Sequence, residues 1–340
     1  YIGLTLILGF WISSRAKAGM RSYFLGGNRL PWYALGLSNA SGMFDVAGTM
    51  WLVSILFVYG LKSIWIPWLW PVFNQIFLMV FLSIWLRRSG AMTGAEWITF
   101  RFGDGTAARL SHLIIVLFAL ILVLAYMAYG FLGIGKLAAQ FIPFDLATTL
   151  HLDALLPRSL QVAGLSGDDL LQRNAMMSGL NEKAYGVCFI ILTSLYVIKG
   201  GMYSVVFTEV LQFVVMTLAS IGVAVIAMMH VSPDMLAAAI PEGWTSPFFG
   251  WELGLDWAEL MPSANAKIAT EGYSLFGIFF MLVLLKGVFT SLAGPAPNYD
   301  MQRILSARSP VDAAKMSALV SVVLNLPRYL FVTGLTILAL

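Results

Sequence analysis

Long apolar stretches separated by shorter polar segments dominate the pattern of this chain. Hydrocarbon leaves backbone groups no partner except one another, so an apolar stretch of about 20 residues predicts a membrane-spanning helix. We predict eight helices, some of which draw on flanking residues: Tyr1–Ile12, Trp32–Gly60, Ser63–Leu86, Leu110–Gly135, Tyr185–Ile198, Ser204–His230, Ser274–Gly294 and Ala314–Leu340. The predicted fold is all-α, a polytopic membrane protein in a lipid bilayer.

Two of these helices carry residues that interrupt a helix. Trp32–Gly60 contains Ser38-Asn39-Ala40-Ser41-Gly42 and then Asp45-Val46-Ala47-Gly48 near its middle, and Ser274–Gly294 runs into Gly294-Pro295-Ala296-Pro297-Asn298. Gly and Pro release backbone groups from the helix, and polar side chains at the same depth can then meet a ligand. Close helix packing is the alternative explanation for the small residues. The two broken helices are five helices apart, as the first helices of two inverted repeats would be, and this spacing favours such repeats.

Composition and charge placement support a membrane location. Hydrophobic residues make up 59% of the chain and charged residues 11%, against about 25% charged residues in a soluble domain. When connections alternate between two sides, twelve Lys and Arg fall on one side and six on the other, so the first side is predicted to be cytoplasmic. Two long outer loops follow, at about Phe141–Lys183 and Val231–Glu271. The expected location is the cell membrane, of the bacterial inner-membrane type.

Four stretches, in order, resemble the sodium:solute symporter family. Ser22–Trp32 contains Tyr-Phe-Leu-Gly-Gly, similar to the family's entry into its first core helix, and Tyr196–Ser204 matches its GG[LMF]x[SAP] signature. Met92–Trp97 resembles the linker after the second core helix, and Tyr299–Arg308 resembles the QR-x-L-x-A element. Together these stretches are specific, although none would suffice alone.

The resemblance implies a leucine-transporter-type core of five plus five inverted helices, preceded by one extra helix. On that map residues 1–340 form one transporter domain. Residues 1–12 are the clipped extra helix, 32–230 the first repeat, and 274–340 the start of an incomplete second repeat. Because the chain begins and ends inside apolar stretches, we expect it to be a fragment of a longer protein, truncated at both ends.

The resemblance also implies sodium-site residues. Counted from the Leu-Gly-Gly entry, the carbonyls of Ser41 and Phe44 fall where the family's sodium-facing carbonyls lie, and the alignment can also slip by two residues. An unwound backbone offers hard oxygen ligands to a cation, which agrees with this placement. Glu209 stands where the family usually has Asp, close to the sodium exit route; a solvated residue at the cytoplasmic interface is the alternative.

Asp45 is the strongest candidate from the residues themselves. A carboxylate at mid-bilayer costs roughly 3 kcal/mol, so it usually faces a wet cavity, a cation or a positive partner. We assign it to sodium or substrate, with a structural ion pair or a neutral acid as the alternative. Lys286 lies deep in its predicted helix, where its stem cannot easily reach the surface. Asn39, Asp45, Lys286 and Asn298 are therefore the substrate candidates.

Absent motifs narrow the function. The chain lacks the phosphate-binding GxxxxGK[ST], the metalloprotease HExxH and the hydrolase GxSxG, so we predict no enzyme and no cofactor. Its basic residues are scattered and not interleaved with aromatics, which argues against nucleic-acid binding. We predict a sodium-coupled symporter of a small polar or charged solute, working by alternating access, with sodium as the coupling ion. The alternatives are proton coupling, or a transporter-like domain at the N-terminus of a sensor kinase.

Overall fold

The computed structural model describes residues 2–12, 19–65, 74–162, 164–248, 253–258, 260–271 and 300–340, and the single positions 285, 288, 289 and 292. These residues form helices and one isolated bridge, from Leu30 to Ala307, but no strand. The all-α prediction is confirmed for this part of the chain. The five-plus-five repeat and the domain boundaries drawn from it stay predictions.

The helices have the following bounds: α1 Ile2–Ile12, α2 Met20–Leu25, α3 Trp32–Met43, α4 Val46–Tyr59, α6 Ser83–Arg88, α7 Gly94–Phe102, α8 Thr106–Phe141, α9 Leu146–Thr149, α10 Asp168–His230, α11 Pro233–Ala239, α12 Pro262–Glu271, α14 Asp300–Ser306, α15 Pro310–Val323 and α16 Asn325–Ala339. A π-helical turn, Leu78–Leu82, leads into α6, and 3-10 turns lie at Gly26–Asn28, Gly60–Trp65, Leu152–Leu155 and Arg158–Leu160.

Three stretches of helix are long and apolar enough to cross a membrane. They are Thr106–Phe141, Asp168–His230 and Pro310–Ala339, and the bent pair Trp32–Met43 with Gly48–Ile64 makes a fourth if counted as one span. Gly3–Ile12 is apolar but shorter. Several of the eight predicted helices are thus present as continuous or bent helices. The predicted span Ser274–Gly294 lies almost entirely outside the described residues.

The chain divides into two compact units, residues 1–115 with 200–340, and residues 116–199. In the smaller unit, α8 and the first part of α10 pack where glycines replace side chains. A Cβ on Gly135 would lie 2.2 Å from the Glu182 carbonyl oxygen. The Asn181 side chain accepts hydrogen bonds from the first N–H groups of α9, and the Tyr185 hydroxyl donates to the Phe144 carbonyl.

The sequence-based boundary of one outer loop was wrong. The segment predicted as a loop at Phe141–Lys183 is helical from Asp168 onward, as the first part of α10. Asp168 and Asp169 lie in the first turn of this helix, where negative charge favours a helix N-terminus. A hydropathy pattern does not reveal this part of the helix, because the residues that follow Asp168 are too polar to be recognised as a membrane span.

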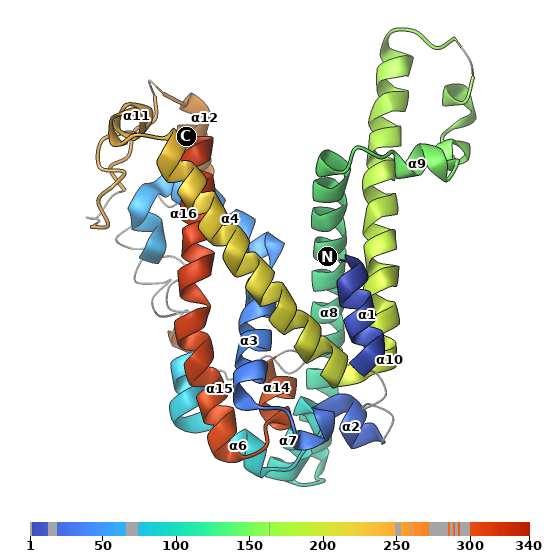
Figure 1. Ribbon diagram of the computed structural model, residues 1–340, viewed down its shortest axis with the longest axis vertical. Helices are drawn as coiled ribbons and strands as arrows, with labels where there is room; N and C mark the ends of the chain where they lie inside the picture. The colour runs from blue at the N-terminus through green and yellow to red at the C-terminus, as the bar shows by residue number, and fades with distance from the viewer. Residues whose placement is uncertain are drawn as a thin grey trace. The chain divides into compact units, whose positions relative to one another are not determined.

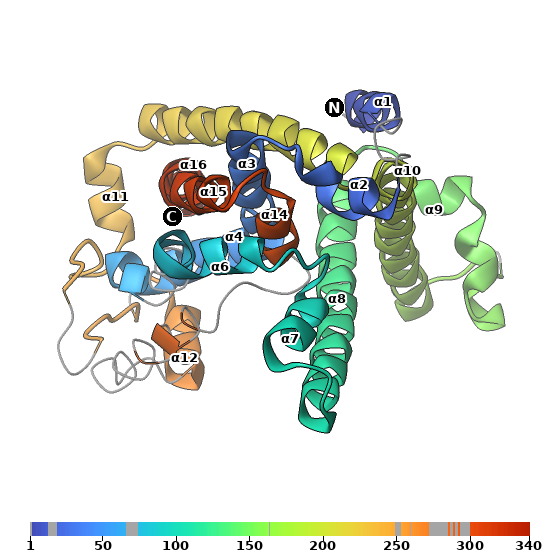
Figure 2. The ribbon, with the colours of Figure 1, turned by 90° about the horizontal axis from the view of Figure 1, so that it is seen from below.

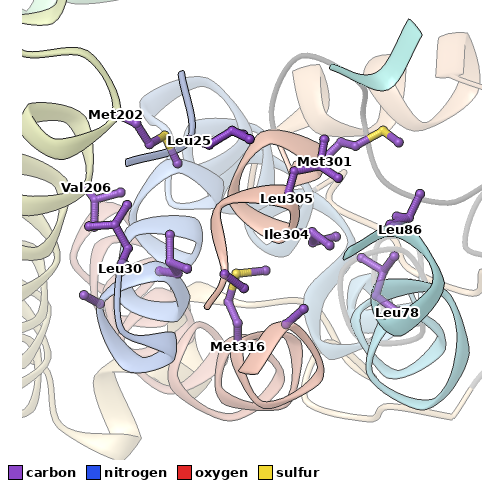
Figure 3. Packing of buried hydrophobic residues seen from close by; sticks show 14 residues of the cluster. Leu25, Leu30, Leu78, Leu86, Met202, Val206, Met301, Ile304, Leu305 and Met316 are labelled. Carbon is purple, nitrogen blue, oxygen red and sulfur yellow. The ribbon is translucent and has the colours of Figure 1, made fainter. Parts of the chain in front are cut away.

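The larger unit is built around the short helix α14. Figure 2 shows α14 between α3, α15 and α6, which all contact it, and Figure 1 shows α15 and α16 end to end beside α3 and α4. Met301, Ile304 and Leu305 of α14 are buried among Leu30, Leu78 and Leu86, with Met316 of α15 nearby (Figure 3). Side chains distant in sequence therefore enclose α14.

The four motifs that resemble the family meet at this cluster. Gly26, Gly27 and Asn28 have φ angles of 54°, 59° and 56°, a left-handed run that glycine and asparagine adopt most readily. The Asn28 amide donates to the Leu305 carbonyl at 2.6 Å. The Leu-Gly-Gly-Asn turn thus binds the QR-x-L-x-A element directly.

The other two motifs reach the same region. Gly201 breaks the helical geometry of α10 with φ 51° and ψ −149°, and a Cβ there would lie 2.5 Å from the Tyr23 carbonyl oxygen. Thr93 caps α7, because its hydroxyl accepts the Glu96 N–H, and the Glu96 carboxylate accepts the Met92 N–H just before the cap. Met92 and Trp97 then pack against the α14 cluster.

A second cluster connects the described residues between Ile240 and Ile268 to the end of α4. The indole of Trp244 donates to the Phe57 carbonyl at 3.0 Å, and the indole of Trp257 donates to the Val58 carbonyl at 2.9 Å. Both rings are buried, and Trp257 stacks on Phe57. These bonds satisfy last-turn carbonyls that a helix leaves unpaired.

Gly60 tests this packing. It has φ +62°, and a Cβ there would lie 2.2 Å from the Trp244 carbonyl oxygen. We expect Gly60→Ala to lower stability by about 1–3 kcal/mol, because the added Cβ would clash with the Trp244 backbone, which cannot easily move aside. The control Gly222→Ala meets nothing within 4 Å inside α10 and should leave stability unchanged or slightly raised. Thermal unfolding of the purified protein in detergent measures both; equal midpoints for the two variants would contradict this packing.

Candidate functional site

The first candidate site is the break between α3 and α4. Trp32–Met43 and Gly48–Ile64 are bent by 56°, and Phe44 has non-helical φ −92° and ψ 55°. Asp45 is the N-cap of α4, and its carboxylate accepts the Gly48 N–H at 2.6 Å. In an unbroken helix that N–H would bond to the Phe44 carbonyl. The interruption predicted from the sequence is therefore confirmed, and Asp45 itself holds it.

Backbone oxygens gather at this break. The Ser41 carbonyl accepts the Phe44 N–H, and the Asp45 carbonyl accepts the Thr49 N–H, each at 3.1 Å. Phe44 is buried, whereas Asp45 is exposed. The break thus brings together three of the residues predicted for sodium: Ser41, Phe44 and Asp45. Asn39, a predicted substrate residue, is fully buried in α3.

Two hydroxyl groups beside the break lack hydrogen-bond partners. Ser41 Oγ and Thr49 Oγ1 are buried and bond to nothing in the described part of the chain. Elsewhere in this protein, helical hydroxyls usually donate to the carbonyl four residues earlier, as Thr208, Thr217 and Thr336 do. The unsatisfied pair marks the break as a place where polar ligand atoms would be accommodated.

Arg328 of α16 faces the same break. Its Nη2 lies 2.9 Å, and Asp45 Oδ2 lies 3.1 Å, from the point where a Cβ on Gly48 would be. Asp45 attracts Arg328 electrostatically. Pro327 precedes Arg328 in the helix. Lys286 and Asn298, the other two predicted substrate residues, lie outside the described residues.

A buried ion pair lies away from the break, toward the Trp32 end of α3. Arg303 Nη2 donates to both carboxylate oxygens of Glu209, at 2.6 and 2.7 Å. Arg303 Nε donates to Ser38 Oγ at 2.9 Å, and the Ser38 hydroxyl donates to Glu209. The side chains of Arg303 and Glu209 are 5% and 16% exposed. This triad joins α3, α10 and α14.

The predicted residues thus fall in two places. Glu209 does not join Ser41, Phe44 and Asp45; it belongs to the triad. Sequence reasoning missed Ser38 and Arg303 as its partners, although Arg303 is the Arg of the QR-x-L-x-A element. It also missed Thr49. No group of three His, Cys, Asp or Glu side chains that could hold a metal ion occurs in the described ranges.

A helical membrane protein whose span is broken at a polar, charged centre has the architecture of a membrane transport protein. The particular family follows from comparison with known proteins. The chain belongs to the sodium:solute symporter family, whose model matches residues 23–164 and 158–242. The break and Glu209 lie inside that region, whereas Arg303 and Arg328 lie beyond it.

Two relatives are similar to this chain over about two thirds of its length. A sodium/glucose cotransporter 4 of Danio rerio is 27% identical over 237 residues, which cover 67% of this chain and 29% of the relative. A sodium/myo-inositol cotransporter of Bos taurus is 26% identical over 245 residues, covering 68% of this chain and 27% of the relative. The chain therefore spans less than a third of either relative.

The triad makes a prediction about stability. Arg303→Gln and Glu209→Gln should each destabilise the protein by about 3–5 kcal/mol, since each leaves a buried charge without its partner. The double variant should be more stable than either single one, because no unpaired charge remains. Lys315→Gln removes an exposed charge and serves as the control. Thermal unfolding measures the stability of the four variants. If the stability loss of the double variant equals the sum of the two single losses, the two charges do not depend on each other.

Proposed function

We propose that this chain is the core of a sodium-coupled secondary transporter, which carries a small polar solute across the cell membrane by alternating access. The observation that carries the proposal is the break between α3 and α4, where backbone oxygens and the Asp45 carboxylate converge in the middle of a span. Membership of the sodium:solute symporter family supports it. Both relatives are named as sodium cotransporters, one with glucose and the other with myo-inositol.

Sodium would bind at the break. The ion favours hard oxygen ligands, and unwound backbone at membrane depth supplies them. The Ser41 and Phe44 carbonyls are the proposed ligands, with Asp45 balancing the positive charge. Since Asp45 also caps α4, bound sodium would favour one arrangement of the two half-helices over others.

The triad would serve as a closure. Ser38, Glu209 and Arg303 hold α3 to α10 and α14, on the side that the charge distribution predicts to be cytoplasmic. A path from the break toward that side requires these helices to part, which breaks the ion pair. Glu209 would then be free of Arg303 and could attract the departing sodium. The Glu209 carboxylate would thus first hold the helices together through Arg303 and later attract sodium on its exit route.

The energy available from sodium is adequate for uptake. One sodium ion entering down a membrane potential of ~100 mV provides about 2.3 kcal/mol. A tenfold sodium gradient adds about 1.4 kcal/mol. With tight coupling, a single ion would sustain a solute gradient of a few hundredfold.

Sodium binding tests the proposal without knowledge of the solute. We expect sodium chloride, but not equal choline chloride, to raise the melting midpoint of the purified full-length protein. Asp45→Asn should raise the sodium concentration needed for half of this effect by tenfold or more, which corresponds to about 1.4 kcal/mol. The control Asp234→Asn removes an exposed acid in α11.

Two results would count against this assignment. Sodium dependence in Asp45→Asn equal to that of the parent would remove Asp45 from the ion site. A melting midpoint that does not change with sodium but changes with pH would favour proton coupling, with Asp45 or Glu209 as the proton carrier.

A further inference from the structure

Arg328 lies too deep in its span to be explained as a surface charge. The apolar stretch Pro310–Ala339 contains 30 residues, and Arg328 lies about 27 Å of helix after Pro310, where the stretch begins. An arginine side chain cannot extend its charge over that distance. Charged groups at such depth are costly and usually face a partner or a wet cavity inside the bundle.

The guanidinium shares one small space with the Asp45 carboxylate. Both groups lie about 3 Å from the missing Cβ of Gly48, so they flank the bare first turn of α4. Yet the two form no ion pair within 4.0 Å among the described side chains, and Asp45 Oδ1 is bonded to the Gly48 N–H. Opposite charges thus meet at mid-span without neutralising each other through direct contact.

Arg328 brings a donor without a partner to this space. Its Nε is buried and has no hydrogen-bond partner among the described residues, and the same is true of Thr49 Oγ1, which follows Gly48 in the first turn of α4. Thr49 is 1% exposed. A buried donor without a partner is unfavourable, and Nε is part of the planar fork with which arginine donates to two oxygens at once. The Arg328 guanidinium therefore has unused donor capacity that suits an acceptor with two oxygens.

From this geometry we propose that Arg328 binds the carboxylate of a small solute at the α3–α4 break, while Asp45 faces a positive charge. The planar carboxylate matches the guanidinium fork, and its single negative charge balances one cation at Asp45. That cation is either sodium, beside a monocarboxylate, or the ammonium group of a zwitterion. A neutral polyol would leave the guanidinium uncompensated when Asp45 is occupied by a cation.

The inference rests on the proposed function and specifies its solute. The carboxylate site lies at the same break as the Ser41 and Phe44 carbonyls, so solute and sodium would bind as neighbours of opposite charge. Each would then strengthen binding of the other by the same factor. The solutes in the names of the two relatives describe those proteins and do not determine the solute of this chain.

Three probes of nearly equal size separate the possibilities. L-lactate carries a carboxylate, L-lactamide replaces it with a neutral amide, and L-alanine adds an ammonium group. In sodium chloride, we expect lactate or alanine to raise the melting midpoint of the purified full-length protein, and lactamide to have no effect at tenfold higher concentration. A response to lactate indicates a monocarboxylate beside sodium, and a response to alanine alone indicates a zwitterion; both support the site.

Variants of Arg328 show whether it makes the contact. Arg328→Gln should weaken the carboxylate response by at least tenfold while the response to sodium alone persists. Arg328→Lys, which keeps the charge but loses the fork, should fall between Gln and the parent. Arg109→Gln removes an exposed arginine and should match the parent in both responses.

The double variant Asp45→Asn with Arg328→Gln addresses a merely structural pair. If the two charges only balance each other, the double variant recovers both stability and the carboxylate response, and the proposal fails. If Arg328 binds the solute, stability recovers but the carboxylate response does not.

Failure of the inference is distinct from failure of the proposed function. A normal sodium effect with no carboxylate response, or with equal responses to lactate and lactamide, overturns the carboxylate site and leaves sodium coupling intact. A carboxylate response that depends on Arg328 but not on sodium supports the site and overturns sodium coupling.

Discussion

The hydrogen bond from the Gly48 N–H to the Asp45 carboxylate is the interaction on which the site depends. Inside a bilayer no water is available to satisfy backbone groups that a broken helix releases, so a break needs a substitute partner within the protein. Asp45 supplies it by capping α4. The same carboxylate brings negative charge to mid-span, which calls for a compensating cation. The side chain that caps α4 is therefore also the one to which we assign the balance of the sodium charge.

The triad of Ser38, Glu209 and Arg303 differs from the break in how fully its polar groups are hydrogen-bonded. Its charges are paired, bonded and buried, whereas Arg328 Nε and the Ser41 and Thr49 hydroxyls are buried without partners among the described residues. In a low-dielectric interior a fully satisfied network gives rigidity, and an unpaired polar group is costly. The triad thus suits holding helices together, and the break is where we propose that ions and solute bind.

Local patterns made part of this structure predictable. Gly42, Asp45 and Gly48 indicated the break, and the apolar runs indicated the long helices, because both depend on residues that are neighbours in sequence. The partners of Glu209 and Asp45 were not predictable in this way. Arg303 and Arg328 come from helices far along the chain, and their meeting depends on how α14 and α16 pack against α3 and α4. The helical start at Asp168 was missed because polar helical turns leave no mark in hydropathy.

Trp244 and Trp257 have a consequence for how the outer segment can vary in length. Their indoles complete the hydrogen bonding of the last turn of α4, and the Leu61 N–H returns a bond to the Trp244 carbonyl. Trp244 and Trp257 are therefore two fixed points at which this segment is bound to the helix. Insertions or deletions next to Trp244 or Trp257 would shift the indoles and leave the Phe57 and Val58 carbonyls unpaired. Related chains should tolerate length changes before Ile240, where helix α11 and its connection are mostly exposed, far better than next to either tryptophan.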